Sequence, residues 1–221
     1  MTDGARGRFI TLEGGEGTGK STLARALAAR LEALGLTVLV TREPGGTPLA
    51  EAARGLLLHP PGEDTWAPLS EALLVNAARQ DHVARRIRPA LEAGHWVICD
   101  RFADSTRVYQ GLAGSVPMAL LRAIETEVLG GTVPDLTLVL DAPLDVTLAR
   151  RVDRGGAQDT FEARGEAFHT AVREAFLQVA AAEPERCAVI DAALAPEQVL
   201  EAAWPRISAL LPAVDAGRVP P

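Results

Sequence analysis

The stretch Gly14-Gly15-Glu16-Gly17-Thr18-Gly19-Lys20-Ser21 determines how the rest of this chain is interpreted. It fits the phosphate-loop pattern G-x-x-x-x-G-K-[ST] without a mismatch. Glycines let successive backbone N–H groups wrap around phosphate oxygens, and a lysine ammonium reaches the β- and γ-phosphates as a compact point charge. Lys20 is the only lysine, against 21 arginines, which favours a chemical role over solvation. The stretch therefore predicts a nucleoside triphosphate site that runs on to Thr22.

The flanks of the stretch have the pattern that a phosphate loop requires, a buried strand before it and a helix after it. Arg8–Glu13 is a short apolar run typical of a strand. Leucines recur at helical spacing after the loop, and Gly35 then supplies a stop signal; these leucines are Leu23, Leu27, Leu31 and Leu34. A true phosphate loop is thus preferred to a chance match in a glycine-rich loop.

Composition narrows the class of protein. The 221 residues suffice for one sizeable core with a lid, so we expect a single domain over residues 1–221. The net charge of −7 argues against a general nucleic-acid binder. Cys99 and Cys187 lie in apolar runs and are expected to be inert core thiols. With no long apolar run and no secretory signal pattern, we expect a cytoplasmic protein without a membrane partner.

Strand-like and helix-like patterns alternate along the chain, which predicts an α/β fold: a doubly wound, five-stranded parallel sheet flanked by helices. The expected strands are Arg8–Glu13, Thr37–Thr41, His95–Asp100, Leu136–Asp141 and Cys187–Asp191. The expected helices are Ser21–Leu34, Leu49–Leu58, Pro68–Ala93, Pro117–Leu129, Leu144–Arg154, Glu162–Ala181 and Pro196–Leu210. Leu211–Pro221 is expected to be a loose tail. Ligands should bind at the carboxyl ends of the strands.

Three of the predicted strands end in an aspartate, namely Asp100, Asp141 and Asp191. An aspartate at such a position, near a phosphate loop, can hold Mg²⁺ together with the hydroxyl of Ser21. Asp100 is favoured because Arg101, an anion-binding side chain, follows it. Asp141 and Asp191 are interpreted as structural, in caps or turns.

Two further strings follow the second and third predicted strands: T-R-E-P-G-G-T at Thr41–Thr47, and D-R-F-A-D-S-T-R-V-Y-Q-G at Asp100–Gly111. Together with the phosphate loop they resemble bacterial thymidylate kinases, in motif order and spacing, from about Arg8 to Leu210. The resemblance implies a P-loop kinase fold, transfer of phosphate from ATP with Mg²⁺ to dTMP, and a homodimer.

The resemblance also implies roles for acceptor-binding residues. Glu16 would accept a hydrogen bond from the deoxyribose 3′-hydroxyl, and the Tyr109 ring would lie against the sugar. Thr106 and Gln110 would address the thymine edge, and Arg79 would contact a thymine carbonyl. The remaining acceptor residues are Arg54 and Arg101 on the monophosphate, Glu43 near that phosphate and the metal, and Ser105. Arg42 is expected only to order its loop.

The sequence departs from the family's pattern in two places. The family usually carries a stacking phenylalanine four residues before the arginine that reads the base, where this chain has Val75. Leu73 or Leu74 could cover the base instead. The second departure is in the lid, about residues 150–162, where the family's D-R-x-E string is Asp159-Thr160-Phe161-Glu162.

Because the phosphate loop holds no arginine, the resemblance implies that lid arginines neutralise charge in the transition state. Arg154 is the leading candidate and Arg150 the second, sharing a helical face at i, i+4; the alternative is a solvated face. Lys20 and Arg101 complete the expected catalytic set. Two other functions stay open: a kinase for another small acceptor, and a regulatory nucleotide switch. A guanine-reading Asn-Lys-x-Asp string needs a second lysine, which the chain lacks.

Overall fold

The computed structural model describes residues 6–62, 65–155, 161 and 164–212. Its centre is a parallel sheet of five strands, as predicted. The structure gives the strand order β2-β3-β1-β4-β5. The strands are β1 (Phe9–Glu13), β2 (Val38–Arg42), β3 (Trp96–Asp100), β4 (Leu136–Asp141) and β5 (Cys187–Asp191). All five lie within one residue of their predicted bounds.

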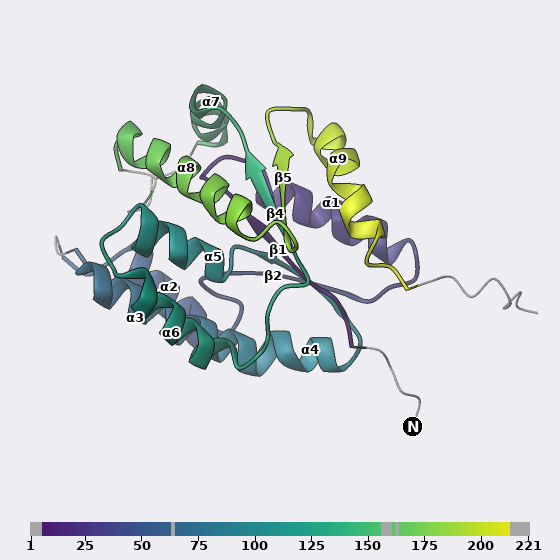
Figure 1. The fold of residues 1–221 in the computed structure, drawn as a ribbon, viewed down its shortest axis with the longest axis horizontal. Helices are drawn as coiled ribbons and strands as arrows, with labels where there is room; N and C mark the ends of the chain where they lie inside the picture. Colours follow the sequence, from purple (N-terminus) through teal and green to yellow (C-terminus); the bar gives the residue numbers. More distant parts are fainter. Residues whose placement is uncertain (1–5, 63–64, 156–160, 162–163, 213–221) are drawn as a thin grey trace, which may run out of the picture.

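Helices cover both faces of the sheet (Figure 1). They are α1 (Lys20–Glu32), α2 (Pro48–Leu58), α3 (Pro68–His82), α4 (Arg88–Glu92), α5 (Ala103–Thr106), α6 (Met118–Leu129), α7 (Leu144–Arg154), α8 (Glu166–Ala182) and α9 (Pro196–Ser208). Two π-helical segments, η1 (Val83–Ile87) and η2 (Arg107–Leu112), complete the order. Among the described residues, no helix combines the length and apolar character needed to cross a bilayer.

The core is divided by the sheet because successive strand residues point to opposite faces. In β1, Ile10 and Leu12 pack with the apolar faces of α1 and α9. Phe9 packs on the other face with Val83 of η1 and Leu91 of α4. Strands buried on both faces carry apolar residues almost throughout, which is why their sequence pattern was clear.

Two helical predictions need correction. The run Pro68–Ala93 is helical throughout but is not one α-helix, since η1 separates α3 from α4. Pro89 lacks a backbone N–H, and the shift to wider hydrogen bonding comes just before it. The predicted helix Glu162–Ala181 begins instead at Glu166, after Gly165 in an extended conformation.

The structure also contains a helical segment that the sequence patterns did not reveal. α5 and η2 run on from one another through residues 103–112 of the D-R-F-A-D-S-T-R-V-Y-Q-G string. At the other end of the chain, Leu211 packs against the first face of the core, so the predicted tail cannot begin there. Residues 213–221 lie outside the described part of the chain.

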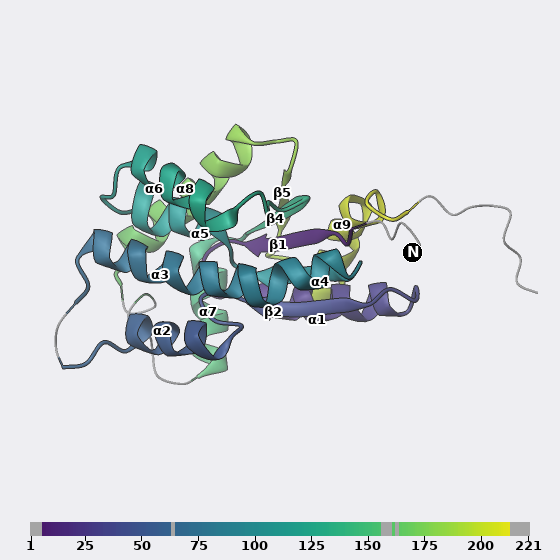
Figure 2. The same ribbon diagram turned by 90° about the horizontal axis from the view of Figure 1, so that it is seen from below.

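α2 and α3 lie side by side at the carboxyl ends of the strands, beyond the sheet (Figure 2). β1 lies between β3 and β4, and β2, the next strand along the chain, is not its neighbour. The chain therefore leaves the central strand in one direction to build β2 and β3, and in the other to build β4 and β5. This is the switch point at which open α/β sheets bind their ligands.

Candidate active site

The phosphate loop joins the end of β1 to the start of α1, as predicted. Its glycines are needed for space as well as for conformation. A Cβ at Gly14 would lie 2.3 Å from the carbonyl oxygen of Leu140, and one at Gly17 would lie 2.6 Å from that of Thr147. Both glycines also have positive φ angles, 133° and 78°. The loop is thus fitted closely against β4 and α7.

Lys20 is the first residue of α1, and its side chain is buried at the centre of the loop. Its Nζ donates hydrogen bonds to the carbonyl oxygens of Gly14, at 3.2 Å, and Gly15, at 2.7 Å. Burial lowers the pKa of the Lys20 ammonium, and the positive charge of Arg101 lowers it further. The only lysine of the chain is therefore held within the loop that the sequence assigned to phosphate.

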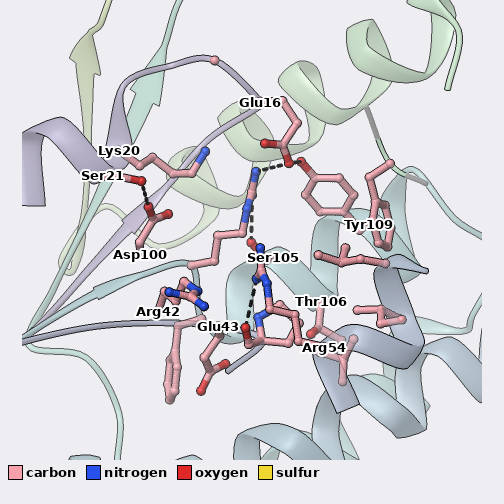
Figure 3. Close-up of a pocket in the computed structure, with 18 of the residues that line it drawn as sticks. Glu16, Lys20, Ser21, Arg42, Glu43, Arg54, Asp100, Ser105, Thr106 and Tyr109 are labelled. Atoms are coloured by element: carbon pink, nitrogen blue, oxygen red, sulfur yellow. Dashed lines mark hydrogen bonds and ion pairs between the residues drawn. The ribbon is translucent and has the colours of Figure 1, made fainter. Parts of the chain in front are cut away.

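Ser21 and Asp100, the predicted metal pair, meet although they lie far apart in the sequence. The Ser21 hydroxyl donates a hydrogen bond to the Asp100 carboxylate (Figure 3). Asp100 is the last residue of β3, the strand that lies next to β1. Hydroxyl and carboxylate oxygens are ligands that suit Mg²⁺, which usually takes most of its others from water and phosphate. The described residues contain no larger cluster of metal-ligating side chains.

Arg101 follows Asp100 in a left-handed conformation, with φ of 69°, the only positive φ at a described residue other than glycine. Its guanidinium donates to Gly14 O at 3.0 Å and to Glu16 Oε1 at 2.6 Å. Burial, the largest single effect, would lower the pKa of Arg101, but the neighbouring acidic groups, Glu16 first among them, together raise it above its ordinary value. Tyr109 lies under the guanidinium, 5.1 Å from ring centroid to Cζ.

Glu13 is a site residue that the sequence reasoning missed. Its Oε1 accepts from the backbone N–H groups of Phe102, at 2.8 Å, and Ser105, at 3.2 Å, and its Oε2 accepts from Ser105 Oγ at 2.6 Å. Burial first, and then the charge of Asp104, raise the pKa of Glu13 to about 7. The available signal was a carboxylate inside a buried strand, one residue before the phosphate loop.

Glu43 and Arg79 form a buried ion pair, with Arg79 Nε 2.6 Å from Glu43 Oε2 and each side chain 2% exposed. The other Glu43 oxygen lies 3.0 Å from His82 Nδ1. Glu43 lines the cavity as expected, but both its oxygens are engaged in holding Arg79 and His82. His82 was also missed, although it lies one helical turn beyond Arg79.

The predicted base-reading groups come together on the far side of the cavity. Arg79 Nη1 donates to Thr106 Oγ1 at 2.9 Å, and Gln110 lies on the same segment as Thr106. Tyr109 places its hydroxyl 3.4 Å from Glu16 Oε1, and burial raises the pKa of that hydroxyl.

Arg54, on α2, donates to Pro44 O at 3.0 Å and faces the same space (Figure 3). Ser105 also lines the cavity, but its hydroxyl donates its hydrogen bond to Glu13. Arg42 forms an ion pair with Glu51 at 2.9 Å, which agrees with the expected role in ordering its loop.

Most of these groups, but not Glu13 or His82, line one cavity of about 810 Å³, within the range of small-molecule sites. Val75 contributes to its wall, at the position where the related enzymes usually carry phenylalanine. Leu73 and Leu74 are not among the lining residues. The apolar surface comes instead from Leu57, Leu58 and Phe161 in addition to Val75.

The lid arginines are placed only in part. Arg150 lines the cavity and donates to the carbonyl oxygens of Ala192 at 2.6 Å, Ala193 at 3.4 Å and Leu194 at 3.3 Å. Arg154 ends α7, but its side chain lies outside the described part of the structure, as do residues 156–160, 162 and 163. The roles predicted for both arginines stay predictions.

A phosphate loop at the switch point of a parallel sheet, sharing one cavity with arginines and with the polar side chains of Thr106 and Gln110, is typical of the P-loop kinases of nucleoside monophosphates. The thymidylate kinase family model matches residues 12–203. A thymidylate kinase of Caulobacter vibrioides is 57% identical over 187 residues, covering 85% of this chain and 89% of that protein. The chain belongs to the thymidylate kinase family.

Two further comparisons agree with this assignment. A thymidylate kinase of Rhodopseudomonas palustris (strain TIE-1) is 54% identical over 201 residues, covering 90% of this chain and 87% of that protein. The crystal structure of thymidylate kinase from Ehrlichia chaffeensis superposes with a TM-score of 0.73 at 32% identity, covering 92% of this chain and 99% of that one.

Proposed function

We propose that this protein transfers the γ-phosphoryl group of ATP to dTMP, giving dTDP and ADP. The observation that carries the proposal is the continuity of the cavity, which joins Lys20 and Ser21 at one end to Arg79, Thr106 and Gln110 at the other. A donor and an acceptor nucleotide bound in one cavity can meet at their phosphates, which is what direct transfer requires.

The transfer needs no general base, because the attacking phosphate oxygen of dTMP is already an anion. A new bond forms between that oxygen and the γ-phosphorus, and the bond to the oxygen bridging the β- and γ-phosphorus atoms breaks. ADP leaves with the electron pair of that bond. Lys20 and Arg101 would stabilise the charge on the transferred group, and losing one such cation should cost about 3–4 kcal/mol of barrier.

Mg²⁺ would be held by Asp100 and Ser21, whose oxygens meet beside the phosphate loop. The ion, when bound, supplies positive charge between the β- and γ-phosphates. Thr22, which follows Ser21 in the first turn of α1, would add to the triphosphate site.

For the acceptor, Glu16 and Tyr109 would hold the sugar, and Arg54 and Arg101 would bind the monophosphate. Arg79, Thr106 and Gln110 would contact the thymine. The hydrogen bond of 2.6 Å between Arg101 and Glu16 supports this division, since it links the phosphate-binding arginine to the sugar-binding acid.

We propose one domain with a lid over residues 150–162, in which Arg154 is the first candidate for the transition-state cation and Arg150 the second. The carbonyl contacts of Arg150 with the segment after β5 favour this order, because they occupy its guanidinium. We further propose a homodimer and a cytoplasmic location. The two buried, unpaired cysteines fit a reducing compartment.

The test is an ADP-release assay with ATP and a panel of acceptors: dTMP, dUMP, UMP, CMP, AMP, GMP and shikimate. We expect the highest kcat/KM with dTMP, and release that depends on the acceptor. Lys20→Ala should keep the fold by circular dichroism and lower kcat by about a hundredfold or more. ADP release without any acceptor, or unchanged turnover in Lys20→Ala, would contradict the proposal.

A further inference from the structure

Glu71, in the first turn of α3, contacts Gln110, a residue of the candidate base site. Its side chain is 10% exposed, and it lies outside the residues that line the cavity. Its Oε1 accepts a hydrogen bond from Gln110 Nε2 at 2.6 Å, and its Oε2 accepts from Arg164 Nη2 at 3.2 Å. Glu71 and Arg164 both lie outside the strings by which the family was recognised.

The contact with Glu71 fixes which end of the Gln110 amide faces the cavity. An ionised carboxylate has only acceptors, so the group 2.6 Å from it must be the NH₂ of Gln110. The carbonyl oxygen of the Gln110 amide then points away from Glu71. Within the described residues it has no hydrogen-bond partner, and Gln110 is a lining residue of the cavity. Gln110 therefore offers the ligand an acceptor.

Arg79 offers the complementary group. Four of its five N–H groups are used, by Glu43, Asn76, Thr106 and the carbonyl oxygen of Phe102. One N–H of Nη2 is left within the described residues. A base that binds here meets a donor from Arg79 and an acceptor from Gln110. Thymine and uracil carry the matching carbonyl and N3–H, whereas N3 of cytosine is an acceptor and would face the Gln110 oxygen.

We infer that Glu71 is a positioning residue that selects the thymine type of base by preventing the Gln110 amide from turning over. Arg164 supports it by pairing with the second carboxylate oxygen, which keeps the Glu71 carboxylate oriented. The Arg164 guanidinium is itself placed by the rings of Phe161 and Phe168, 4.6 and 4.5 Å from its Cζ. The inference rests on dTMP as the acceptor of the proposed function.

The test is the ratio of kcat/KM for dTMP to kcat/KM for dCMP, with ATP saturating. In Glu71→Gln the new amide can donate as well as accept, so Gln110 can present either end to the base. We expect the ratio to fall by about tenfold or more, with the KM for ATP unchanged. Glu201→Gln is the matched control: it makes the same change in an exposed ion pair with Arg30 and should leave the ratio as in the wild type.

A double-mutant cycle separates positioning from a general loss of structure. In a Gln110→Ala background, Glu71→Gln should have no further effect on the ratio, because the group that it orients is gone. An equal loss of kcat/KM for dTMP and dCMP, or an effect that persists without Gln110, would overturn the inference. If wild type does not prefer dTMP, the proposed function fails instead, and the two results are distinct.

Should Glu71→Gln not fold, Arg164→Gln tests the same contact from its partly exposed side. Releasing one carboxylate oxygen lets Glu71 rotate, and the ratio should fall by about threefold or more, since the pair that fixes the carboxylate is lost. A ratio equal to that of the wild type in the folded Arg164→Gln protein would overturn the role given to Glu71.

Discussion

Glu13 shows how one carboxylate can connect the two halves of the site. It ends β1, the strand that leads into the phosphate loop, and it accepts three hydrogen bonds from Phe102 and Ser105. These contacts fix the turn in which Arg101 takes its left-handed conformation. A strained arginine persists only where its surroundings hold it, and Glu13 is part of that surrounding.

The raised pKa of Glu13 predicts a pH dependence of stability. Burial raises the pKa from 4.5 to about 7, so the folded state binds this proton more tightly than the unfolded chain. The stabilising contribution is complete below about pH 4.5 and is lost as the pH rises to about 7. Glu13→Gln does not titrate, so between about pH 5 and pH 8 the wild type should lose about 2–3 kcal/mol of unfolding free energy relative to it.

Chemical denaturation of both proteins at the two pH values measures this difference. Glu201→Gln, at an exposed position, is the control and should follow the wild type at both. Parallel pH profiles for wild type and Glu13→Gln would show that Glu13 has an ordinary pKa in the folded protein.

The sequence predicted the residues of the site better than their partners. Lys20, Ser21 and Asp100 lie where the motifs placed them, because short strings at strand ends report backbone geometry directly. Glu71 and His82 were missed because they act through residues distant in the sequence, Gln110 and Glu43. Such pairings depend on how α3 packs against the rest of the fold, and no local spacing encodes that packing.

At the scale of elements, the segment formed by α5 and η2 is held by a buried network of charges. Arg107, at the start of η2, donates to Glu125 of α6, to Asp104 and to Glu183. Burial would lower the pKa of Arg107, but its bond to Glu125 and the nearby acids raise it overall. The network therefore anchors the segment that carries Tyr109 and Gln110 into the cavity.

Arg107→Met should uncouple this segment from α6. Removing Arg107 leaves the Glu125 carboxylate, 14% exposed, without a partner among the described residues, whereas Asp104 and Glu183 keep Arg186. We expect a loss of about 2–4 kcal/mol in unfolding free energy. The KM for dTMP should rise more than the KM for ATP, because only the acceptor side is loosened. Arg122→Met is the control, since its side chain is 55% exposed and 3.7 Å from Glu183; it should cost less than about 0.5 kcal/mol. Equal rises in both KM values would refute the anchoring role.

The elements themselves were predictable to different degrees. All five strands were predicted within one residue of each end, because each is a short, dense apolar run. β1, β3 and β4 are buried on both faces, and the edge strands β2 and β5, although partly exposed, keep the same composition. The α5–η2 segment was not predicted as helical. It is short, it begins directly after the turn at Arg101, and its polar groups serve the cavity instead of an amphipathic stripe. The π-helical segment η1 was also missed. A single turn with wider hydrogen-bond spacing changes the apolar pattern of a long helical run too little to be recognised in the sequence.

At the scale of the whole molecule, α3 and α6 pack together and expose large apolar side chains. Leu69 and Leu73, one turn apart on α3, are 44% and 51% exposed, and Leu120 on α6 is 41% exposed. If the proposed homodimer forms through this face, Leu73→Asp should shift the protein to a monomer in size-exclusion chromatography with light scattering. A charge within an apolar interface is costly. Leu34→Asp, in the turn after α1 and 56% exposed, should leave the dimer intact. A monomeric wild type would exclude the dimer.

The strand order has a consequence for how the protein is made. β1 leaves the ribosome well before either of its neighbours in the sheet, β3 and β4, is synthesised. The fit of Gly14 against the Leu140 carbonyl cannot exist until the chain has been extended beyond β4. The nascent polypeptide must therefore carry its nucleotide-binding motif unassembled until β4 has been synthesised, and the phosphate loop reaches its final packing only when β4 pairs with β1.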